Sequence, residues 1–261
     1  MNIVVCVKQV PDTWSEKKLA ASDSTLDRAA TDPVMNEMDE YAVEEALKLQ
    51  EAHGGEVTIL CMGPDAATET VRKALSMGAD KAIHVLDEGL HGSDALATSL
   101  ALSKAISKAG GFDLVLLGSE SSDARMSVVP AMLAERLGLP QLTFAKEVTA
   151  DGAGAISIKR LTDDGYQVVE ASTPAVVSVV EKINEPRYPS FKGIMAAKKK
   201  PVAALTLADV GVDASQVGLE HAVTTVISAS PKPPKSAGEK VTDEGDGGAK
   251  IAAYLVAQKL I

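Results

Sequence analysis

The chain has 261 residues, of which 46% are hydrophobic and 3% aromatic, and its formal net charge at pH 7 is -10. This length allows one large domain, or one domain with a long extension, and a sizeable buried core. The negative charge argues against nucleic acid as a partner, because phosphate binding needs concentrated lysine and arginine. The single cationic run, Lys198–Lys200, does not reverse this balance; it fits either a solvated loop end or a surface that docks to an acidic partner.

The cysteines and the N-terminus bear on the compartment. Cys6 and Cys61 each end an apolar run without disulfide or metal-ligand spacing, so we expect two small buried residues. The first residues, M-N-I-V-V-C-V-K, lack the features of a signal peptide. No apolar run approaches the ~20 residues of a membrane span. We therefore expect a cytoplasmic protein without direct membrane insertion.

Short apolar runs alternate with helical patterns through the first 140 residues. We predict strands over residues 3–7, 57–62, 81–86 and 112–117. The helices between and after them are predicted to begin at Asn36, after the turn of residues 63–65, at Ser93 and near Ser127. This alternation predicts a mainly parallel sheet flanked by helices. Residues 13–33 are polar and form a long excursion, with a short hairpin around residues 24–27.

The predicted helices have recognisable caps and inner faces. Asn36 and Asp39 have the spacing of a capping box at the start of the first helix. Adjacent Glu44 and Glu45 are interpreted as part of a solvated face. The predicted inward positions are Val43, Ala46, Leu47 and Gln50 in the first helix and Leu96, Leu100 and Ile106 in the third.

After Pro140 the pattern changes to short strands separated by turns. We predict strands over residues 142–148, 155–161, 167–172 and 175–180. The first three are interpreted as two successive hairpins added to one edge of the parallel sheet. The fold class is therefore α/β, with a mainly parallel sheet, flanking helices and added β-hairpins.

The regular pattern ends at residue 205. Residues 228–236 are proline-rich, residues 241–248 are acidic and glycine-rich, and residues 251–260 read as a short amphipathic helix. Such a tail is either a disordered end or an arm held by another chain, and its apolar stripe favours the arm. We predict a domain over residues 1–204 and a C-terminal arm over residues 205–261.

Ligands of open parallel sheets bind beyond the carboxyl ends of the strands, at the switch point of the topology. Residues 6–8, 36–39, 62–64 and 118–129 should converge there. The last stretch begins G-S-E-S-S-D and leads into a helix whose N-terminus offers free N–H groups and a positive dipole end. It suits a phosphate or a ribose, and it equally fits an ordinary capped loop.

Several other kinds of site are excluded. No G-x-G-x-x-G follows a strand, and no Walker loop is present. The four histidines, His53, His84, His91 and His221, are scattered, so neither a zinc cluster nor a Ser-His-Asp set is readable. We predict no metal site, no catalytic acid–base pair and no catalytic residue.

Residues 181–200, E-K-I-N-E-P-R-Y-P-S-F-K-G-I-M-A-A-K-K-K, differ from everything before them. Pro186 and Pro189 fix φ and disfavour helix in the residues that precede them. Large side chains follow on this proline frame, and Gly193 is taken as the end of the loop. The segment is either a plain surface connection or a contact surface, and its aromatic residues favour the contact surface.

This segment closely resembles the recognition loop of the beta subunits of electron-transfer flavoproteins. The N-E-P-R-Y core, an apolar residue three places after the tyrosine, and the I-M-A-A-K-K-K run occur together. The order of elements fits the family over nearly the whole chain, with an adenine nucleotide alpha hydrolase-like sheet. The resemblance is to the actinobacterial type, and the K-Q-V-P-D-T start also resembles the branch with nitrogen-fixation-type and bifurcating members.

The resemblance implies a non-enzymatic electron carrier subunit. It would pair with an alpha subunit that holds most of the FAD, accept electrons from flavin dehydrogenases such as the acyl-CoA dehydrogenases of fatty acid beta-oxidation, and serve a quinone-side oxidoreductase. It also implies that this subunit binds AMP, or a second FAD in bifurcating members. The implied nucleotide site comprises Cys6, Asn36, Glu37, Met38, Asp39, Met62, Gly118, Ser119, Asp123, Met126, Ser127, Val128 and Val129.

Two features of the chain differ from the usual family pattern. The family carries more acidic and amide residues where this chain has M-S-V-V-P before its helix, so we expect mainly backbone contacts to a phosphate. The implied docking residues are Glu185, Pro186, Arg187, Tyr188, Phe191, Ile194 and Met195. Phe191 occupies a commonly aliphatic position, and as a buried anchor it would contribute about 2 kcal/mol or more to docking. The C-terminal arm would hold the alpha subunit.

The alternative is a stand-alone nucleotide-binding protein, similar to universal stress proteins or to ATP-dependent ligases with a related sheet. Such ligases have S-G-G-x-D-S after the first strand, where this chain has V-K-Q-V. Stress proteins have spaced glycines after the fourth strand, where this chain has only Gly118. Neither class accounts for residues 181–200 or for the tail.

Overall fold

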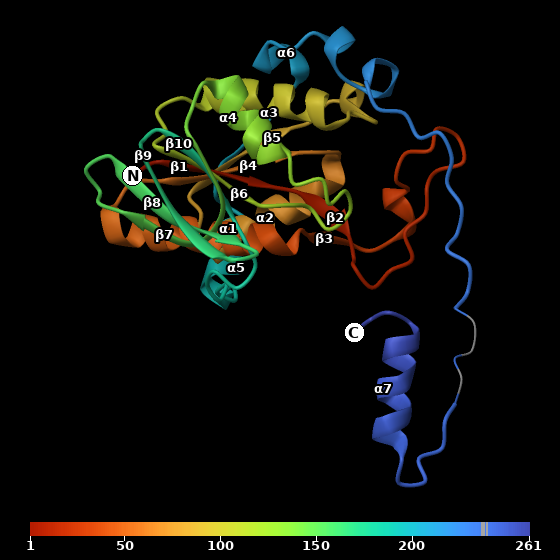
Figure 1. Cartoon of the computed structure of the whole chain (residues 1–261). Coiled ribbons are helices and arrows are strands. Elements are labelled where there is room, and N and C mark those ends of the chain that lie inside the picture. Colours follow the sequence, from red (N-terminus) through yellow and green to blue (C-terminus); the bar gives the residue numbers. More distant parts are fainter. Residues whose placement is uncertain (236–237, 239) are drawn as a thin grey trace. The chain divides into compact units, whose positions relative to one another are not determined.

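The computed structural model describes residues 1–235, 238 and 240–261 (Figure 1). The chain divides into two units, Met1–Thr225 and Val226–Ile261. The boundary expected after residue 204 therefore lies inside the first unit. The reason is that Leu207, Val210, Val212 and Val217 are buried in the same hydrophobic cluster as strand and helix residues of the body.

A nine-stranded sheet forms the centre of the first unit, in the order β11-β5-β4-β1-β6-β10-β7-β8-β9. Every pairing from β11 to β7 is parallel, whereas β7, β8 and β9 pair antiparallel. The strands are β1 (Ile3–Val7), β4 (Val57–Met62), β5 (Lys81–Val85), β6 (Leu114–Gly118), β7 (Gln141–Ala150), β8 (Ala155–Thr162), β9 (Gly165–Ser172), β10 (Ala175–Val179) and β11 (Val202–Leu205). The predicted parallel sheet with two hairpins at one edge is confirmed.

Helices cover both faces of the sheet (Figure 1). One face packs against α1 (Glu37–His53) and α2 (Thr68–Met77), and the other against α3 (Ala95–Ala109), α4 (Val129–Leu137) and α6 (Leu207–Val210). Strands β1, β6 and β10 are buried at every residue, which explains their continuous apolar runs. Both cysteines are buried and free, as expected.

The excursion after β1 contains a small two-stranded sheet that the sequence did not reveal. β2 (Gln9–Pro11) pairs antiparallel with β3 (Pro33–Met35). The hairpin expected around residues 24–27 is present in reduced form, as a bridge between Leu19 and Leu26. Strand β11 was also unforeseen; it adds to the edge of the sheet beside β5.

Two helices begin later than predicted. The third begins at Ala95, because the Asp94 carboxylate caps it by accepting from the Ala97 N–H at 3.0 Å. Ser93 instead accepts from the Gly218 N–H at 2.9 Å. Leu96, expected inside, is exposed near the start of this helix. The fourth helix begins at Val129 rather than Ser127, because Ser127 adopts a left-handed backbone with φ 55°.

The segment of residues 181–200 is only partly irregular. Its second half forms α5 (Phe191–Ala197), capped by the Ser190 hydroxyl, which accepts from the Gly193 N–H at 3.0 Å. Gly193 therefore lies inside a helix and does not end the segment. A Cβ at Gly193 would lie 2.6 Å from the Ser76 carbonyl oxygen, so this position allows the helix to approach α2 closely.

The second unit contains α7 (Gly247–Ala257), which overlaps the helix predicted over residues 251–260. Its exposed apolar side chains include Ile251, Tyr254 and Val256. Residues 226–235 contain no helix or strand, and the rest of the predicted extended stretch, residue 236, lies outside the described residues. None of the helices in the described residues combines the length and apolar character needed to cross a membrane.

Candidate functional site

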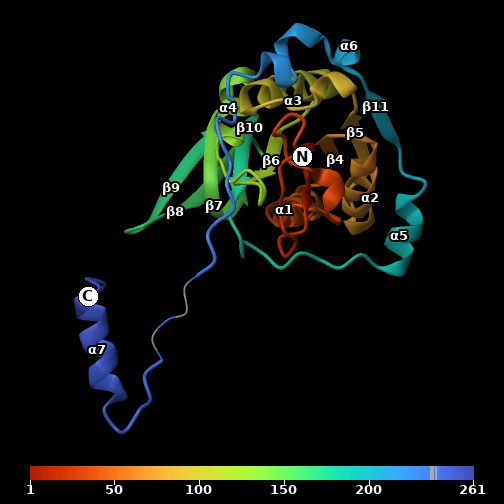
Figure 2. The ribbon, with the colours of Figure 1, turned by 90° about the vertical axis from the view of Figure 1, so that its right-hand side faces the viewer.

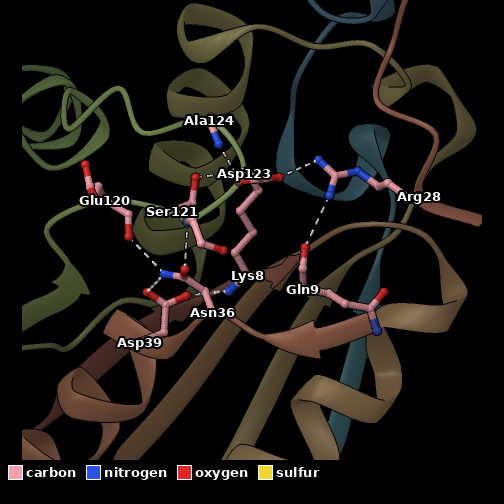
Figure 3. Close-up of polar contacts among 10 residues, drawn as sticks. Lys8, Gln9, Arg28, Asn36, Asp39, Glu120, Ser121, Asp123 and Ala124 are labelled. Carbon is pink, nitrogen blue, oxygen red and sulfur yellow. Dashed lines mark hydrogen bonds and ion pairs between the residues drawn. The ribbon is translucent and has the colours of Figure 1, made fainter. Parts of the chain in front are cut away.

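The switch point of the sheet lies between β1 and β6. From β1 the chain continues to β4 and β5 on one side, and it later returns to β6 on the other. Lys8 follows β1 directly, and Gly118 is the last residue of β6. Figure 3 shows that polar side chains from the end of β1, the start of α1 and the loop after β6 meet at this edge, together with Arg28 from the excursion between β2 and β3.

Asn36 and Asp39 join these three segments. The Asn36 amide donates to Asp39 Oδ1 at 3.0 Å and to the Glu120 carbonyl at 2.9 Å, and its oxygen accepts from the Ser122 N–H at 3.0 Å. Asp39 Oδ2 accepts from the Lys8 N–H at 2.8 Å. The capping box expected for this pair is therefore wrong, because both side chains bind neighbouring segments in place of the helix N-terminus.

Asp39 is buried, and its surroundings have opposing effects on its pKa. Burial raises the pKa of Asp39 to about 7, although hydrogen bonds from Asn36, Lys8 and Gly118 each oppose the rise. Gly118 lets α1 approach the sheet, since a Cβ there would lie 2.5 Å from Met38 Cβ and 2.6 Å from Asp39 Oδ1. The glycine is therefore required by packing at the site.

Two cations converge on one carboxylate at the same edge. Lys8 Nζ lies 2.8 Å from Asp123 Oδ1, and Arg28 Nη2 lies 3.0 Å from Oδ2 (Figure 3). The Asp123 side chain is only 2% exposed, whereas both cations remain partly exposed. Burial alone would raise the pKa of Asp123, but Lys8, Ser121 and Arg28 together lower it to about 2. The carboxylate is therefore charged and holds two cations beside the loop.

The loop before α4 presents backbone donors. Arg125 and Ser127 have left-handed φ values of 48° and 55°. In the described part of the chain, the N–H groups of residues 126–129 have no hydrogen-bond partner. Successive N–H groups in such a loop, at a helix N-terminus, form a concave site for an anion. The Ser122 hydroxyl is also buried without a partner, so polar capacity remains for a ligand.

The structure brings most of the predicted nucleotide-site residues to this edge. Met38, Ser119, Asp123, Ser127, Val128 and Val129 lie in the segments that form it, and Met126 is exposed on its loop. Met62 is the last residue of β4 and Cys6 the residue before the last of β1, so both lie near this edge. Burial and the Asp39 charge raise the pKa of the Cys6 thiol, so Cys6 is neutral and serves as part of the wall. Glu37 differs, because it lines a cavity of about 190 Å³ beside Tyr188.

Sequence reasoning placed Lys8 at this edge, within residues 6–8, but gave its side chain no role, and it did not single out Arg28. Lys8 directly follows the first strand, which was a usable signal. Arg28 lies in the polar excursion, and only the fold brings it to Asp123, 95 residues away in the sequence. Among the described residues, no group of three or more His, Cys, Asp or Glu side chains is placed to hold a metal ion.

The predicted docking residues divide into an exposed set and a buried attachment. Tyr188 is 97% exposed and Phe191 80% exposed, and Ile194 and Met195 are exposed beside them. Glu185 is exposed and Pro186 partly buried. Arg187 instead faces the body, where its guanidinium binds Glu44 and Glu51.

This attachment corrects two interpretations. Glu44 and Glu45 are buried, not solvated, because they bind Arg187 and Asn184 of the segment. Lys200, taken as part of a uniform cationic run, donates to the carbonyls of Leu75, Gly78 and Ala79 at the end of α2.

Comparison with known proteins decides the family. The model of the electron transfer flavoprotein domain matches residues 23–210. The electron transfer flavoprotein subunit beta of Mycobacterium tuberculosis strain H37Rv is 57% identical over 265 residues, covering 100% of this chain and 99% of that protein. The chain belongs to the beta-subunit family of electron transfer flavoproteins. The beta subunit of Megasphaera elsdenii is 38% identical over 272 residues, covering 100% of both chains.

A further relative is named caffeyl-CoA reductase-Etf complex subunit CarD, from Acetobacterium woodii. It is 35% identical over 259 residues, covering 99% of this chain and 97% of that protein. As a beta subunit of an electron transfer flavoprotein, the chain functions in electron transfer, and the resemblance drawn from residues 181–200 is confirmed. The alternative of a stand-alone stress-type protein gains no support from these relatives.

Proposed function

We propose that this chain pairs with an alpha subunit carrying most of the redox FAD, binds an adenine nucleotide at the β1–β6 edge, and receives electrons from flavin dehydrogenases through residues 184–197. The FAD supplies the redox chemistry when bound. The chain itself contributes a folded support, a nucleotide site and a contact surface. It would act as a carrier in the cytoplasm and pass electrons to a quinone-side oxidoreductase.

The backbone donors of residues 126–129 carry the nucleotide part of the proposal. They are unpartnered within the described chain and lie at a helix N-terminus, and the Lys8 and Arg28 cations bind Asp123 in the same loop. An anionic phosphate is favoured at such a place by hydrogen bonding and by charge. The residues present therefore fit the phosphate of an adenine nucleotide, with mainly backbone contacts.

The exposed side chains of Tyr188, Phe191, Ile194 and Met195 support the docking part. A contiguous set of large apolar groups on a fixed segment is typical of an interaction surface. The partner would be a flavin dehydrogenase, such as an acyl-CoA dehydrogenase of fatty acid beta-oxidation. The contact should be small and short-lived, because a carrier must leave after each transfer.

The second unit, residues 226–261, would bind the alpha subunit. Its helix α7 exposes Ile251, Tyr254 and Val256, and none of its described residues is buried. An apolar helix face without a core of its own gains stability when another chain covers it.

The direct test is to purify the complex with its alpha subunit, unfold it and identify the released nucleotides. We expect FAD and AMP in equal amounts. Two FAD per complex would support the nucleotide site but assign the protein to the bifurcating type. Release of FAD alone, at one per complex, would contradict an adenine nucleotide in this subunit. The variant Ser127→Pro should reduce AMP content, because proline removes one N–H donor and also cannot adopt the φ of 55° that the loop has at this position, and it should leave FAD content unchanged.

A further inference from the structure

Arg187 is central to the shape of the docking segment, which we define as residues 184–200. We propose that Arg187 is a positioning residue: it binds Glu44 on α1 and so holds the exposed side chains of the segment in the arrangement that the dehydrogenase meets. This inference rests on the proposed docking function. It assigns a role to a side chain that faces away from the partner.

The contacts of Arg187 are directional and numerous. Its Nε lies 2.8 Å from Glu44 Oε2 and its Nη2 lies 2.9 Å from Oε1, a bidentate pair. Its backbone N–H donates to the same Oε2 at 3.0 Å, so both main chain and side chain are fixed. Its Nη1 lies 2.6 Å from Oε1 of Glu51, which follows Glu44 by seven residues in α1. A bidentate arginine–carboxylate pair fixes orientation as well as distance.

The Glu44 carboxylate is suited to this task. Its side chain is 8% exposed, whereas that of Glu51 is 60% exposed. A carboxylate at such burial needs its hydrogen bonds, and Arg187 supplies three of them. Asn184 adds a second attachment next to it, by donating to Glu45 Oε2 and to the Tyr41 carbonyl, both at 3.0 Å.

The far end of the segment is attached to α2. Lys200 Nζ donates to the carbonyls of Leu75 and Gly78 at 3.0 Å and of Ala79 at 2.6 Å. Arg72 in α2 donates from Nη1 to the carbonyls of Ala197 at 2.7 Å and Lys200 at 3.0 Å. Figure 2 shows the segment leaving β10, passing α1 and reaching α5 beside α2.

Side-chain contacts are needed to hold the docking segment against the body, because regular backbone hydrogen bonding does not hold it there. Residues 184–190 form no helix or strand, and Pro186 and Pro189 lack N–H groups that could bind the body. Between the two attachments lie the exposed side chains of Tyr188, Phe191, Ile194 and Met195. A surface that is ordered before binding loses less conformational freedom on docking than a mobile one does.

The expected effect is on recognition, not on the electron-transfer step. Without the Arg187–Glu44 pair, the segment must order when the dehydrogenase binds, so the KM for the dehydrogenase rises. Once bound, the geometry is the same, and kcat changes little. A role of Arg187 as a direct surface contact would instead make substitution of the buried Glu44 harmless to KM.

The test uses the complete complex with its alpha subunit and measures FAD reduction at increasing dehydrogenase concentration. The variants are Arg187→Ala, Arg187→Lys and Glu44→Gln, with Glu51→Gln as the matched control on the same helix. We expect KM to rise ~10-fold for Arg187→Ala and Glu44→Gln, less for Arg187→Lys, and least for Glu51→Gln, with kcat within ~2-fold. Hydrogen exchange in residues 185–197 should accelerate in the same order.

Phe191→Ala distinguishes failure of the docking function from failure of the positioning role of Arg187. If Phe191→Ala raises KM and Glu44→Gln does not, the positioning role is overturned while docking stands. If Phe191→Ala also leaves KM unchanged, the docking function fails and the positioning role fails with it. Retained FAD and nucleotide content in each variant establishes that the complex is intact.

Discussion

The ammonium of Lys8, at the end of β1, lies 2.8 Å from Asp123 Oδ1 in the loop after β6. This pair spans the switch point of the sheet and holds the loop whose backbone donors face the proposed nucleotide. Arg28 binds the other carboxylate oxygen from the excursion between β2 and β3. One buried carboxylate thus fixes three segments that are distant in the sequence.

Replacing that carboxylate should weaken both the fold and the nucleotide site. Asp123→Asn leaves Lys8 and Arg28 without their counter-charge, so we expect the free energy of unfolding to fall by about 1–3 kcal/mol, less than for fully buried pairs because both cations are partly exposed. The pKa of Asp123 is about 2, below its ordinary 3.8, so its stabilisation is present above pH 4 and is lost as pH falls toward 2. Urea unfolding of both proteins across this range measures it; equal stability at pH 7 would contradict the account.

Asp39 should give the opposite pH dependence. Its pKa of about 7 lies above its ordinary 3.8, so the folded protein holds a proton that the unfolded chain releases. The free energy of unfolding should therefore fall as pH rises from about 4 to about 7. Asp39→Asn should be less stable, because its NH₂ group would face N–H donors. Its free energy of unfolding should not show the fall between about pH 4 and about pH 7. Denaturant unfolding at several pH values compares the two slopes, and parallel slopes would refute the assignment.

A methyl group at Gly118 should push α1 from the sheet. The added Cβ would lie 2.5 Å from Met38 Cβ and 2.9 Å from the Met38 carbonyl carbon, which cannot move without the helix. We expect Gly118→Ala to lower stability by about 1–3 kcal/mol and to reduce AMP retention. Gly248→Ala is the control, because a Cβ there meets nothing within 4 Å. Thermal unfolding that is unchanged by Gly118→Ala would show that the site tolerates the displacement.

Removal of residues 226–261 should separate assembly from folding. The first unit has its own buried clusters, all within residues 1–225, so the shortened chain should stay folded. We expect its affinity for the alpha subunit to fall by at least ~10-fold, since an exposed apolar helix is lost from the interface. Sedimentation of the mixed subunits measures this affinity, and full retention of the complex would remove the second unit from the interface.

The central strands were predictable because β1, β4, β6 and β10 are almost wholly buried and are rich in apolar residues. The two hairpins were equally readable from turns such as Asp163–Gly165. Strand β11, V-A-A-L, was missed because it has only four residues and closely follows a run of lysines. It is recognisable as a strand only from its pairing with β5. The predicted helix starts erred by up to two residues where a side chain such as Asp94, or a left-handed residue such as Ser127, decides the boundary.

The candidate site was predictable in position but not in its contacts. Strand ends at a switch point localise Asn36, Asp39 and Gly118 without knowledge of side-chain geometry. Arg28 reaches Asp123 only through the fold of a polar excursion that has no periodic signal. Glu44 and Glu45 were misassigned because an acidic pair on a helix is usually solvated. Their partners, Arg187 and Asn184, lie 143 and 139 residues later in the sequence.

The most direct test of the account is the rate of FAD reduction in the complex by a flavin dehydrogenase, measured for wild type and Phe191→Ala over a range of dehydrogenase concentrations. Phe191 is 80% exposed, so its truncation should not disturb the fold. We predict that half-saturation requires at least ~10-fold more dehydrogenase, with unchanged FAD content. An unchanged concentration dependence, or FAD loss in proportion to the lost rate, would contradict docking through this segment.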